Sequence, residues 1–410
     1  MVPRPEPPPT AAPRTLDEAL ARIARLDARL HAFTHIAPRP GGPGPLAGWP
    51  LALKDNIEVE GEPLGLGSAA VPRVATRTAP VVQRLRAAGA ALVGRTHMVE
   101  YAFGGWGLNA ALGAPRNPWD DAVHRVAGGS SSGAAVAVAA GMARLALGTD
   151  TAGSVRMPAA LCGVVGFKPS FGRYPSDGVF PLAPSYDSVG VLASTVADAM
   201  AADAVLAGGD AGAAIDAVVV VDPRGWPVPV EPAVRTAVQT AAEALERLGL
   251  RVRIATLPLD LAALARDAGT LIAAEAWAVH RDRFEARPGH YGAEMRRRLA
   301  AARDLDPTAV QAARAARADA ERTFRAALAP GAALLLPSVP CVAPPVDAVS
   351  ESGAPLGAFT RWVNHVGGCA LSLPAGGDAQ GLPVAVQLVA AGGADRALLD
   401  LGGRLASTGA

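Results

Sequence analysis

Three features that mark other functional classes are scarce or missing in this sequence. Its three cysteines, Cys162, Cys341 and Cys369, are too few and too scattered for a disulfide framework or a zinc ribbon, so a reducing, cytoplasmic setting is expected. No run reaches the roughly 18 uncharged apolar residues that a membrane span needs. The start of the chain also lacks a charged region followed by an apolar one, which argues against export.

An excess of charge of either sign is missing as well. The chain has 38 Lys and Arg against 37 Asp and Glu, a net charge of +1. A surface that binds nucleic acid or an anionic membrane would show a clustered basic excess, so neither partner is expected. What the chain does have is length and apolar content, because half of its 410 residues are hydrophobic. A chain of this size can bury a large core.

Lysine is almost absent. Only Lys54 and Lys168 are lysines, and every other residue in the Lys and Arg count is arginine. A guanidinium group does not lose its proton in a protein, whereas a desolvated ammonium group can. Both lysines are therefore candidates for proton chemistry, and chance survival is the competing explanation for either one alone.

The hydrophobic pattern predicts an α/β protein. Apolar residues recur at helical spacing over residues 16–30, with Thr15 as the N-cap, and we expect further helices at 81–88, 232–248 and 394–405. Short apolar runs predict strands at 49–59, 91–93, 215–221, 334–337, 370–373 and 384–389. This alternation is typical of one large sheet covered by helices on both faces.

The expected organisation is a single domain over residues 14–410. Residues 1–13 are rich in proline and predict a disordered tail, and the Gly/Pro-rich stretch 38–45 predicts a linker. Residues 259–329 are rich in Ala, Arg and Glu and strongly helical. Together with the segment from Ala207, they predict a peripheral, mostly helical elaboration around 207–330.

Residues 128–133, Gly-Gly-Ser-Ser-Ser-Gly, form a small-residue loop that opens an apolar run. The loop lacks the Gly-Lys-Ser/Thr of a P-loop, which excludes that nucleotide-binding motif. It also matches the Gly-x-Ser-x-Gly nucleophile elbow, with Ser131 at the centre. That motif requires a preceding strand, and residues 115–126 predict a loop, so the match is interpreted as accidental. The histidines available as bases, His280, His290 and His365, have no distinctive setting.

A second Gly-rich loop covers residues 148–156 and contains Ser154. Consecutive small residues allow several N–H groups to converge on one oxyanion, although a tight structural turn has the same composition. A serine hydroxyl is a poor nucleophile until a base takes its proton. Without a well-placed histidine, a neutral lysine is the remaining candidate base, as in the serine–lysine variants of the catalytic triad.

Taken together, these motifs resemble those of the amidase signature family, and the resemblance covers most of the chain. The matching segments are Leu-Lys-Asp-Asn at 53–56, the loops at 128–133 and 148–156, Gly-Phe-Lys-Pro-Ser at 166–170, residues 185–190, Asn364, and Gly-Leu-Pro-Val-Ala-Val-Gln at 381–387. The resemblance implies an amidase signature fold, a small-molecule amide substrate and no metal or organic cofactor. A homodimer is expected from the resemblance alone.

The resemblance also implies the roles of individual residues. Ser154 is the expected nucleophile, Ser130 the bridging serine and Lys54 the base, with a cis peptide between Gly129 and Ser130. Lys168 matches a family position outside this triad and is expected to be structural. The N–H groups of four consecutive residues would form the oxyanion hole, namely those of Thr151, Ala152, Gly153 and Ser154.

Two departures from the family pattern leave the reacting atoms in place. Ala127 replaces a frequent proline and Ala152 a frequent glycine. The function expected is hydrolysis of a linear carboxylic amide to an acid and ammonia or an amine. A glutamine-dependent amidotransferase subunit, which supplies ammonia to a partner protein, stays open as the alternative. A non-enzymatic binding protein is disfavoured because all three triad positions are present.

Overall fold

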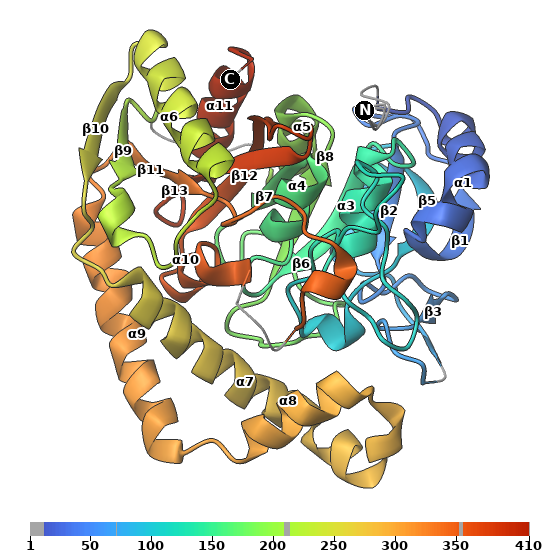
Figure 1. The fold of residues 1–410 in the computed structure, drawn as a ribbon. Coiled ribbons are helices and arrows are strands. Elements are labelled where there is room, and N and C mark those ends of the chain that lie inside the picture. The colour runs from blue at the N-terminus through green and yellow to red at the C-terminus, as the bar shows by residue number, and fades with distance from the viewer. Residues whose placement is uncertain (1–11, 71, 209–213, 352–355, 410) are drawn as a thin grey trace.

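A computed structural model describes residues 12–70, 72–208, 214–351 and 356–409. The elements form one large sheet flanked by helices, and a group of long helices extends beyond its edge (Figure 1). Most of the predicted Pro-rich tail, 1–13, lies outside the described residues. None of the helices in the described ranges combines the length and apolar character that a membrane crossing requires.

Eleven of the thirteen strands form a mixed sheet in the order β1-β5-β2-β6-β8-β7-β12-β13-β11-β9-β10, and β3 pairs separately with β4. Two parallel groups, β5-β2-β6 and β11-β9-β10, are separated by antiparallel strands. The strands are β1 Phe33–Arg39, β2 Pro50–Lys54, β3 Pro63–Leu64, β4 Arg73–Val74, β5 Ala91–Thr96, β6 Leu145–Asp150, β7 Val165–Lys168, β8 Ser188–Ala193, β9 Ala217–Val221, β10 Arg251–Ala255, β11 Ala332–Pro337, β12 Cys369–Gly377 and β13 Pro383–Ala390.

Helices cover both faces of this sheet. The described α-helices are α1 Leu16–Leu30, α2 Pro80–Ala87, α3 Ser132–Ala139, α4 Arg156–Cys162, α5 Val196–Ala207, α6 Pro232–Arg247, α7 Leu261–Ala286, α8 Ala293–Arg303, α9 Pro307–Ala327, α10 Arg361–His365 and α11 Asp395–Ala406. Helices α2, α5, α6 and α11 bury their apolar residues on one face. Helices α1, α3 and α4, and farther along α7, α9 and α10, pack on the other.

The two-sided burial follows from the period of two in a strand, because neighbouring side chains point to opposite faces. In β2, Leu51 and Leu53 belong to the core under α2 and α5, whereas Ala52 packs against α3. In β11, Leu335 and Leu336 divide in the same way between the two faces. The predicted fold class, an α/β protein with one large mixed sheet covered on both faces, is confirmed.

Several predicted elements are confirmed nearly to the residue. Helix α1 covers the whole predicted range, and the Thr15 hydroxyl accepts a hydrogen bond from the Glu18 N–H as its N-cap. The predicted helices at 81–88, 232–248 and 394–405 correspond to α2, α6 and α11. Residues 259–329 contain α7, α8 and α9, which form the extension in Figure 1.

Other expectations were only partly correct. Of the linker predicted at 38–45, residues 40–45 are irregular, but residues 38 and 39 belong to β1, which pairs with β5 through residues that carry no apolar alternation. The second Gly-rich loop is shorter than predicted, because Gly148, Thr149 and Asp150 pair with β8 in the sheet. The apolar run was too short there to predict a strand. The grouping of residues 14–410 as one domain stays a prediction, and β9 and β10 of its elaboration lie in the main sheet.

The sheet topology brings the segments that follow β2 and β6 together at the carboxyl ends of these two strands. Strands β2 and β6 are parallel neighbours, so their carboxyl ends lie side by side. Strand β2 ends at Lys54, and β6 ends at Asp150 and leads into the loop that contains Ser154. Helix α3, which follows Ser130, packs across both strands. The fold therefore places all three expected triad positions at one end of the sheet.

Two adjacent glycines in α11 provide a test of this packing. A Cβ at Gly402 would clash with the buried side chain of Leu371 on β12, whereas a Cβ at Gly403 would have only ordinary contacts at 3.9 Å. We expect Gly402→Ala to destabilise the protein by about 1–3 kcal/mol through overpacking. Gly403→Ala should leave stability unchanged or raise it by up to about 1 kcal/mol, because alanine is the better helix former.

Urea unfolding followed by circular dichroism measures both variants against the wild type. A Gly402→Ala midpoint equal to or above that of Gly403→Ala would contradict the close approach of α11 to β12.

Candidate active site

Lys54 ends β2 with its side chain fully buried. Its Nζ donates hydrogen bonds to Ser130 Oγ at 2.7 Å and to Thr149 Oγ1 at 2.8 Å. Asn56 Nδ2 donates to the same Thr149 hydroxyl at 3.2 Å, which fixes the threonine against the lysine. The amine therefore contacts hydroxyl groups, and no carboxylate among the described residues lies within ion-pair distance of it.

Burial lowers the pKa of Lys54 from its ordinary 10.5 to about 7, because the charged form loses its hydration. The carboxylates of Asp187 and Asp150 act in the opposite direction, but they do not restore the ordinary value. The adjacent Asp55 faces away from the amine, as expected, and accepts hydrogen bonds from the Gly65 N–H and the Thr34 hydroxyl. A substantial fraction of Lys54 is consequently neutral near pH 7.

The loop 128–131 carries Ser130 between Lys54 and the segment of Ser154. The Gly129–Ser130 peptide is cis, which confirms the prediction. Backbone hydrogen bonds hold the loop on three sides: from Gly129 to the Gly105 carbonyl at 2.8 Å, from Val99 to the Ser130 carbonyl at 3.1 Å, and from Ser131 to the Ser154 carbonyl at 3.1 Å. The last bond joins the two loops that the sequence singled out.

A buried ion pair shapes the turn that carries Ser154. Arg156 donates to Asp150 through Nε at 3.0 Å and Nη2 at 2.9 Å, with both side chains inaccessible to solvent. The Asp150 carboxylate also accepts from the N–H groups of Gly153 and Val155. Burial would raise the pKa of Asp150, but the Arg156 charge outweighs it and holds that pKa well below its usual range.

Two C-terminal residues complete this network. Arg156 donates to Asn364 Oδ1 at 2.6 Å and to Gln387 Oε1 at 2.7 Å, and Asn364 returns a hydrogen bond to Asp150 Oδ1 at 3.0 Å. In the sequence, Asn364 and Gln387 are only parts of a family pattern. In the structure both side chains accept hydrogen bonds from Arg156 and so help to hold the Ser154 turn.

One of the four expected oxyanion donors is not available. The Gly153 N–H donates to Asp150 Oδ1 at 2.8 Å, so it is occupied within the protein. In the described part of the chain, the N–H groups of Thr151, Ala152 and Ser154 donate to no other protein group. Gly153 has a different role, since it adopts φ +116° and a Cβ there would clash with the Thr360 hydroxyl.

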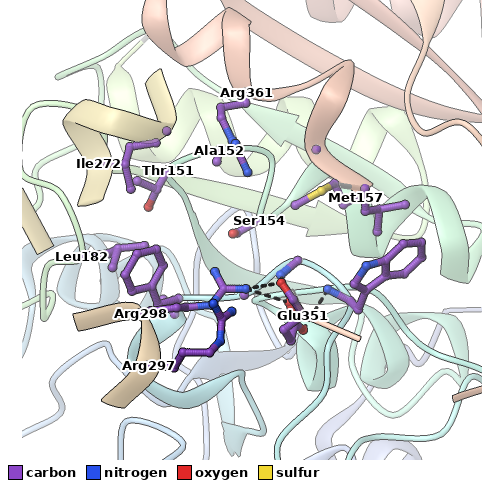
Figure 2. A pocket seen from close by; sticks show the side chains of 18 residues that line it. Thr151, Ala152, Ser154, Met157, Leu182, Ile272, Arg297, Arg298, Glu351 and Arg361 are labelled. Carbon is purple, nitrogen blue, oxygen red and sulfur yellow. Dashed lines mark hydrogen bonds and ion pairs between the residues drawn. The ribbon is translucent and has the colours of Figure 1, made fainter. Parts of the chain in front are cut away.

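A cavity of about 390 Å³ opens beside this turn (Figure 2). Thr151, Ala152 and Ser154 form one part of its lining. Aromatic and aliphatic side chains line much of the rest, including Phe103, Trp106, Met157, Leu182, Ile272 and Leu356. Its charged lining consists of Arg297, Arg298, Glu351 and Arg361.

Sequence reasoning missed these four charged residues. Arg297 and Arg298 lie in α8, within a segment that was expected to be only a peripheral elaboration. An Ala/Arg/Glu-rich helix has the composition of a solvated surface, and no spacing in it indicates a cavity wall. Gly269 and Ile272 of α7 line the same cavity, so the helical extension forms part of the candidate site.

The alternative candidates from the sequence do not meet at this cavity. Ser131 is fully buried and directs its hydroxyl to the Thr149 carbonyl at 3.4 Å. The segment before it contains two isolated bridges, Arg116 with Val126 and Arg125 with Pro345, and not the strand that a nucleophile elbow requires. The histidines lie elsewhere: His280 contacts the Tyr291 hydroxyl, His365 contacts that of Tyr186, and neither they nor His290 line the cavity.

Lys168 is also buried, but its surroundings differ from those of Lys54. Its Nζ donates to the carbonyls of Pro169 at 2.6 Å and Gly368 at 2.9 Å, and it does not line the cavity. Burial lowers its pKa to about 8. Within the described ranges, no group of three or more His, Cys, Asp or Glu side chains is placed to hold a metal ion.

Comparisons with known proteins show what the whole chain is similar to. A family model described as Amidase matches residues 11–399. The 2-amino-5-chloromuconic acid deaminase of Comamonas testosteroni is 38% identical over 84% of this chain and 78% of its own. A glutamyl-tRNA(Gln) amidotransferase subunit of Symbiobacterium thermophilum is 35% identical over 94% of this chain and 86% of its own. A crystal structure of an amidase matches 97% of this chain and 96% of its own, with a TM-score of 0.84 and 34% identity.

Proposed function

We propose that this chain, which belongs to the amidase signature family, hydrolyses a linear carboxylic amide to an acid and ammonia or an amine. The observation that carries the proposal is the buried Lys54 amine, whose pKa is lowered to about 7 and which donates to Ser130 at 2.7 Å. The Ser130 loop is bonded in turn to the Ser154 segment at the cavity. This arrangement supports proton transfer between a neutral lysine and a serine nucleophile.

In the first half-reaction, neutral Lys54 accepts the Ser130 proton, and Ser130 takes the proton of Ser154. The Ser154 oxygen forms a bond to the substrate carbonyl carbon, which becomes tetrahedral and carries an oxyanion. The proton then returns through Ser130 to the amide nitrogen. The carbon–nitrogen bond breaks, and ammonia or an amine leaves an acyl group on Ser154.

The oxyanion is stabilised by backbone donors at the Ser154 turn. The N–H groups of Thr151, Ala152 and Ser154 are the available set, and each donor contributes about 3–4 kcal/mol in comparable sites. The Asp150–Arg156 ion pair holds this turn rigid before substrate binds, so that little reorganisation is needed during the reaction. Water then hydrolyses the acyl-enzyme with the same residues as proton carriers.

The relatives support two versions of this chemistry. One is named a deaminase of an organic acid, which is consistent with ammonia as a leaving group. Another is an amidotransferase subunit, so release of ammonia for a partner protein is the second candidate function. A small-molecule amide fits the 390 Å³ cavity in either version. Homodimerisation and a cytoplasmic location stay predictions of the sequence.

Acylation of Ser154 is the first testable consequence. A fluorophosphonate should add its mass to the tryptic peptide that contains Ser154, because this serine lines the cavity and Ser131 does not. Mass spectrometry of the labelled protein locates the adduct, and Ser154→Ala is the control that should remain unlabelled. An adduct on Ser131 would revive the nucleophile elbow and contradict the proposed mechanism.

The second testable consequence is the role of Lys54 as a neutral base. Lys54→Arg keeps the charge but cannot give up the proton, so we expect kcat/KM to fall by at least about 100-fold with the fold intact. In the wild type, kcat/KM should rise about tenfold per pH unit below pH 7 and level off above it, because only the neutral amine reacts. Asp187→Asn removes a charge that raises the Lys54 pKa, so this limb should move to lower pH.

The matched control is Lys168→Arg, since Lys168 is equally buried but donates only to backbone carbonyls. Provided that circular dichroism shows a folded protein, this variant should keep its activity. Turnover of Lys54→Arg close to that of the wild type would mean that Lys54 serves only as a charge or packing group.

The third testable consequence is that hydrolysis does not depend on a partner protein. The purified chain should by itself release ammonia or an amine from at least one member of a panel of simple amides, measured by a coupled ammonia assay. Ser154→Ala in the same assay gives the background. Glutaminase activity that appears only when a second protein is present would favour the amidotransferase alternative.

A further inference from the structure

Arg361 is a charged residue of the cavity that has no role in the proposed reaction mechanism. It is the first residue of α10, and its side chain lines the cavity that contains Ser154. Its Nε atom is enclosed and has no hydrogen-bond partner. Its Nη1 makes only a long contact of 3.5 Å with the Ala265 carbonyl, and no carboxylate in the described ranges pairs with it.

The other charges at the cavity are balanced among themselves. Arg297 donates to both oxygens of Glu294, at 3.0 and 2.6 Å. Arg298 donates to Glu294 at 2.9 Å and lies 3.6 Å from a Glu351 oxygen. The Glu351 carboxylate also accepts from three backbone N–H groups, of which the shortest bond, from Gly105, is 2.7 Å. Two arginines thus face two carboxylates, and Arg361 leaves one unbalanced positive charge.

Arg361 is partly buried, and enclosing a guanidinium N–H without an acceptor is unfavourable. Arginine cannot avoid this cost by becoming neutral at ordinary pH. Burial and the Arg298 charge lower the pKa of Arg361, which is the direction expected for a cation that lacks a counterion. A bound anion would supply the missing hydrogen-bond acceptors and the missing charge. A carboxylate suits a guanidinium best, because two parallel N–H···O bonds form at once.

The position of Arg361 connects it to the reacting centre. The preceding residue, Thr360, donates its hydroxyl to the Ala152 carbonyl at 2.7 Å, so the start of α10 is attached to the Ser154 turn. In the view of Figure 2, Ser154 lies between Arg361 on one side and the Arg298–Glu351 pair on the other. An anion held by Arg361 therefore shares the cavity with the carbonyl that Ser154 attacks.

We propose that Arg361 binds a carboxylate of the substrate, so that the preferred substrates are amides that also carry an acid group. This inference rests on the proposed amidase function and names its substrate class. The acid group has two chemical sources, the acyl part, as in the monoamides of dicarboxylic acids, and the amine part, as in N-acylated amino acids. Both present the same carboxylate to the guanidinium group.

The kinetic test compares charged and uncharged amides. Succinamate, glutaramate and N-acetylglycine are the charged probes, and their methyl esters, which carry an added methyl group in place of the charge, are the uncharged ones. Release of ammonia or of the amine is measured for both, so that cleavage of the ester bond is not counted. Wild type should prefer at least one acid over its ester by about 100-fold or more in kcat/KM. Arg361→Gln should lose most of that preference and change turnover of the esters less than about threefold, and Arg361→Lys should keep part of it.

Arg325→Gln is the control, because Arg325 is an exposed arginine of α9 that lines neither of the two cavities bordered by Arg361. This variant should behave as the wild type does. Which charged probe is preferred assigns the acid group to the acyl or the amine part. An equal fall for acids and esters in Arg361→Gln, or a wild type that prefers the esters, would overturn the proposal.

A binding measurement separates this inference from the amidase function itself. Glutarate and succinate should bind the wild type and Arg325→Gln in calorimetry and slow the labelling of Ser154 by a fluorophosphonate, whereas Arg361→Gln should show neither effect. These readouts need no turnover, so they test the carboxylate site even if no amide in the panel is hydrolysed. Labelling of Ser154 that the dicarboxylates never slow, together with no calorimetric binding, would overturn it.

Discussion

The hydrogen bonds of the buried Lys54 amine to hydroxyl groups, away from any carboxylate, are the interactions on which the candidate site depends. A lysine with an ion-pair partner would stay charged and could accept no proton. Here Ser130 and Thr149 satisfy the amine without stabilising its charge as a carboxylate would, and burial lowers its pKa to about 7. Asp187 and Asp150 act against this shift from a distance, so the position of these two side chains sets how far the pKa falls.

The second constraint lies at the end of the neighbouring strand β6, where, in contrast to Lys54, a buried charge is paired with an opposite charge. Asp150 and Arg156 form a fully buried ion pair whose remaining hydrogen bonds join it to Gly153, Val155, Asn364 and Gln387. A buried pair contributes little net stability, since desolvation offsets most of the attraction. Its effect here is on geometry, because it holds the Ser154 turn in a shape in which three N–H groups have no acceptor among the described residues. Breaking it would leave a buried charge unpaired as well as releasing the turn.

The cavity wall has a different origin from the reacting groups. Ser154 and its neighbours come from the ends of central strands, whereas Arg297, Arg298, Gly269 and Ile272 come from the long helices that extend beyond the sheet. The expected reacting groups thus lie at the ends of packed strands, and part of the cavity lining comes from helices that reach beyond the sheet.

Sequence by itself determined the elements with strong local signals and supplied the candidate reacting groups. Capping, hydrophobic period and residue type are local properties, so the sequence alone shows three kinds of feature. These are the capped, amphipathic helix at 16–30, the two isolated lysines and the two small-residue loops. Tertiary structure alone decided which N–H groups stay available, since the Gly153 N–H donates to the Asp150 carboxylate, which is held in turn by Arg156 and Asn364. It also decided that Arg361 faces a cavity unpaired while similar arginines in α8 find partners. Burial and pairing are set by segments far apart in the chain, such as Arg156 with Asn364 and Gln387, and no local pattern encodes them.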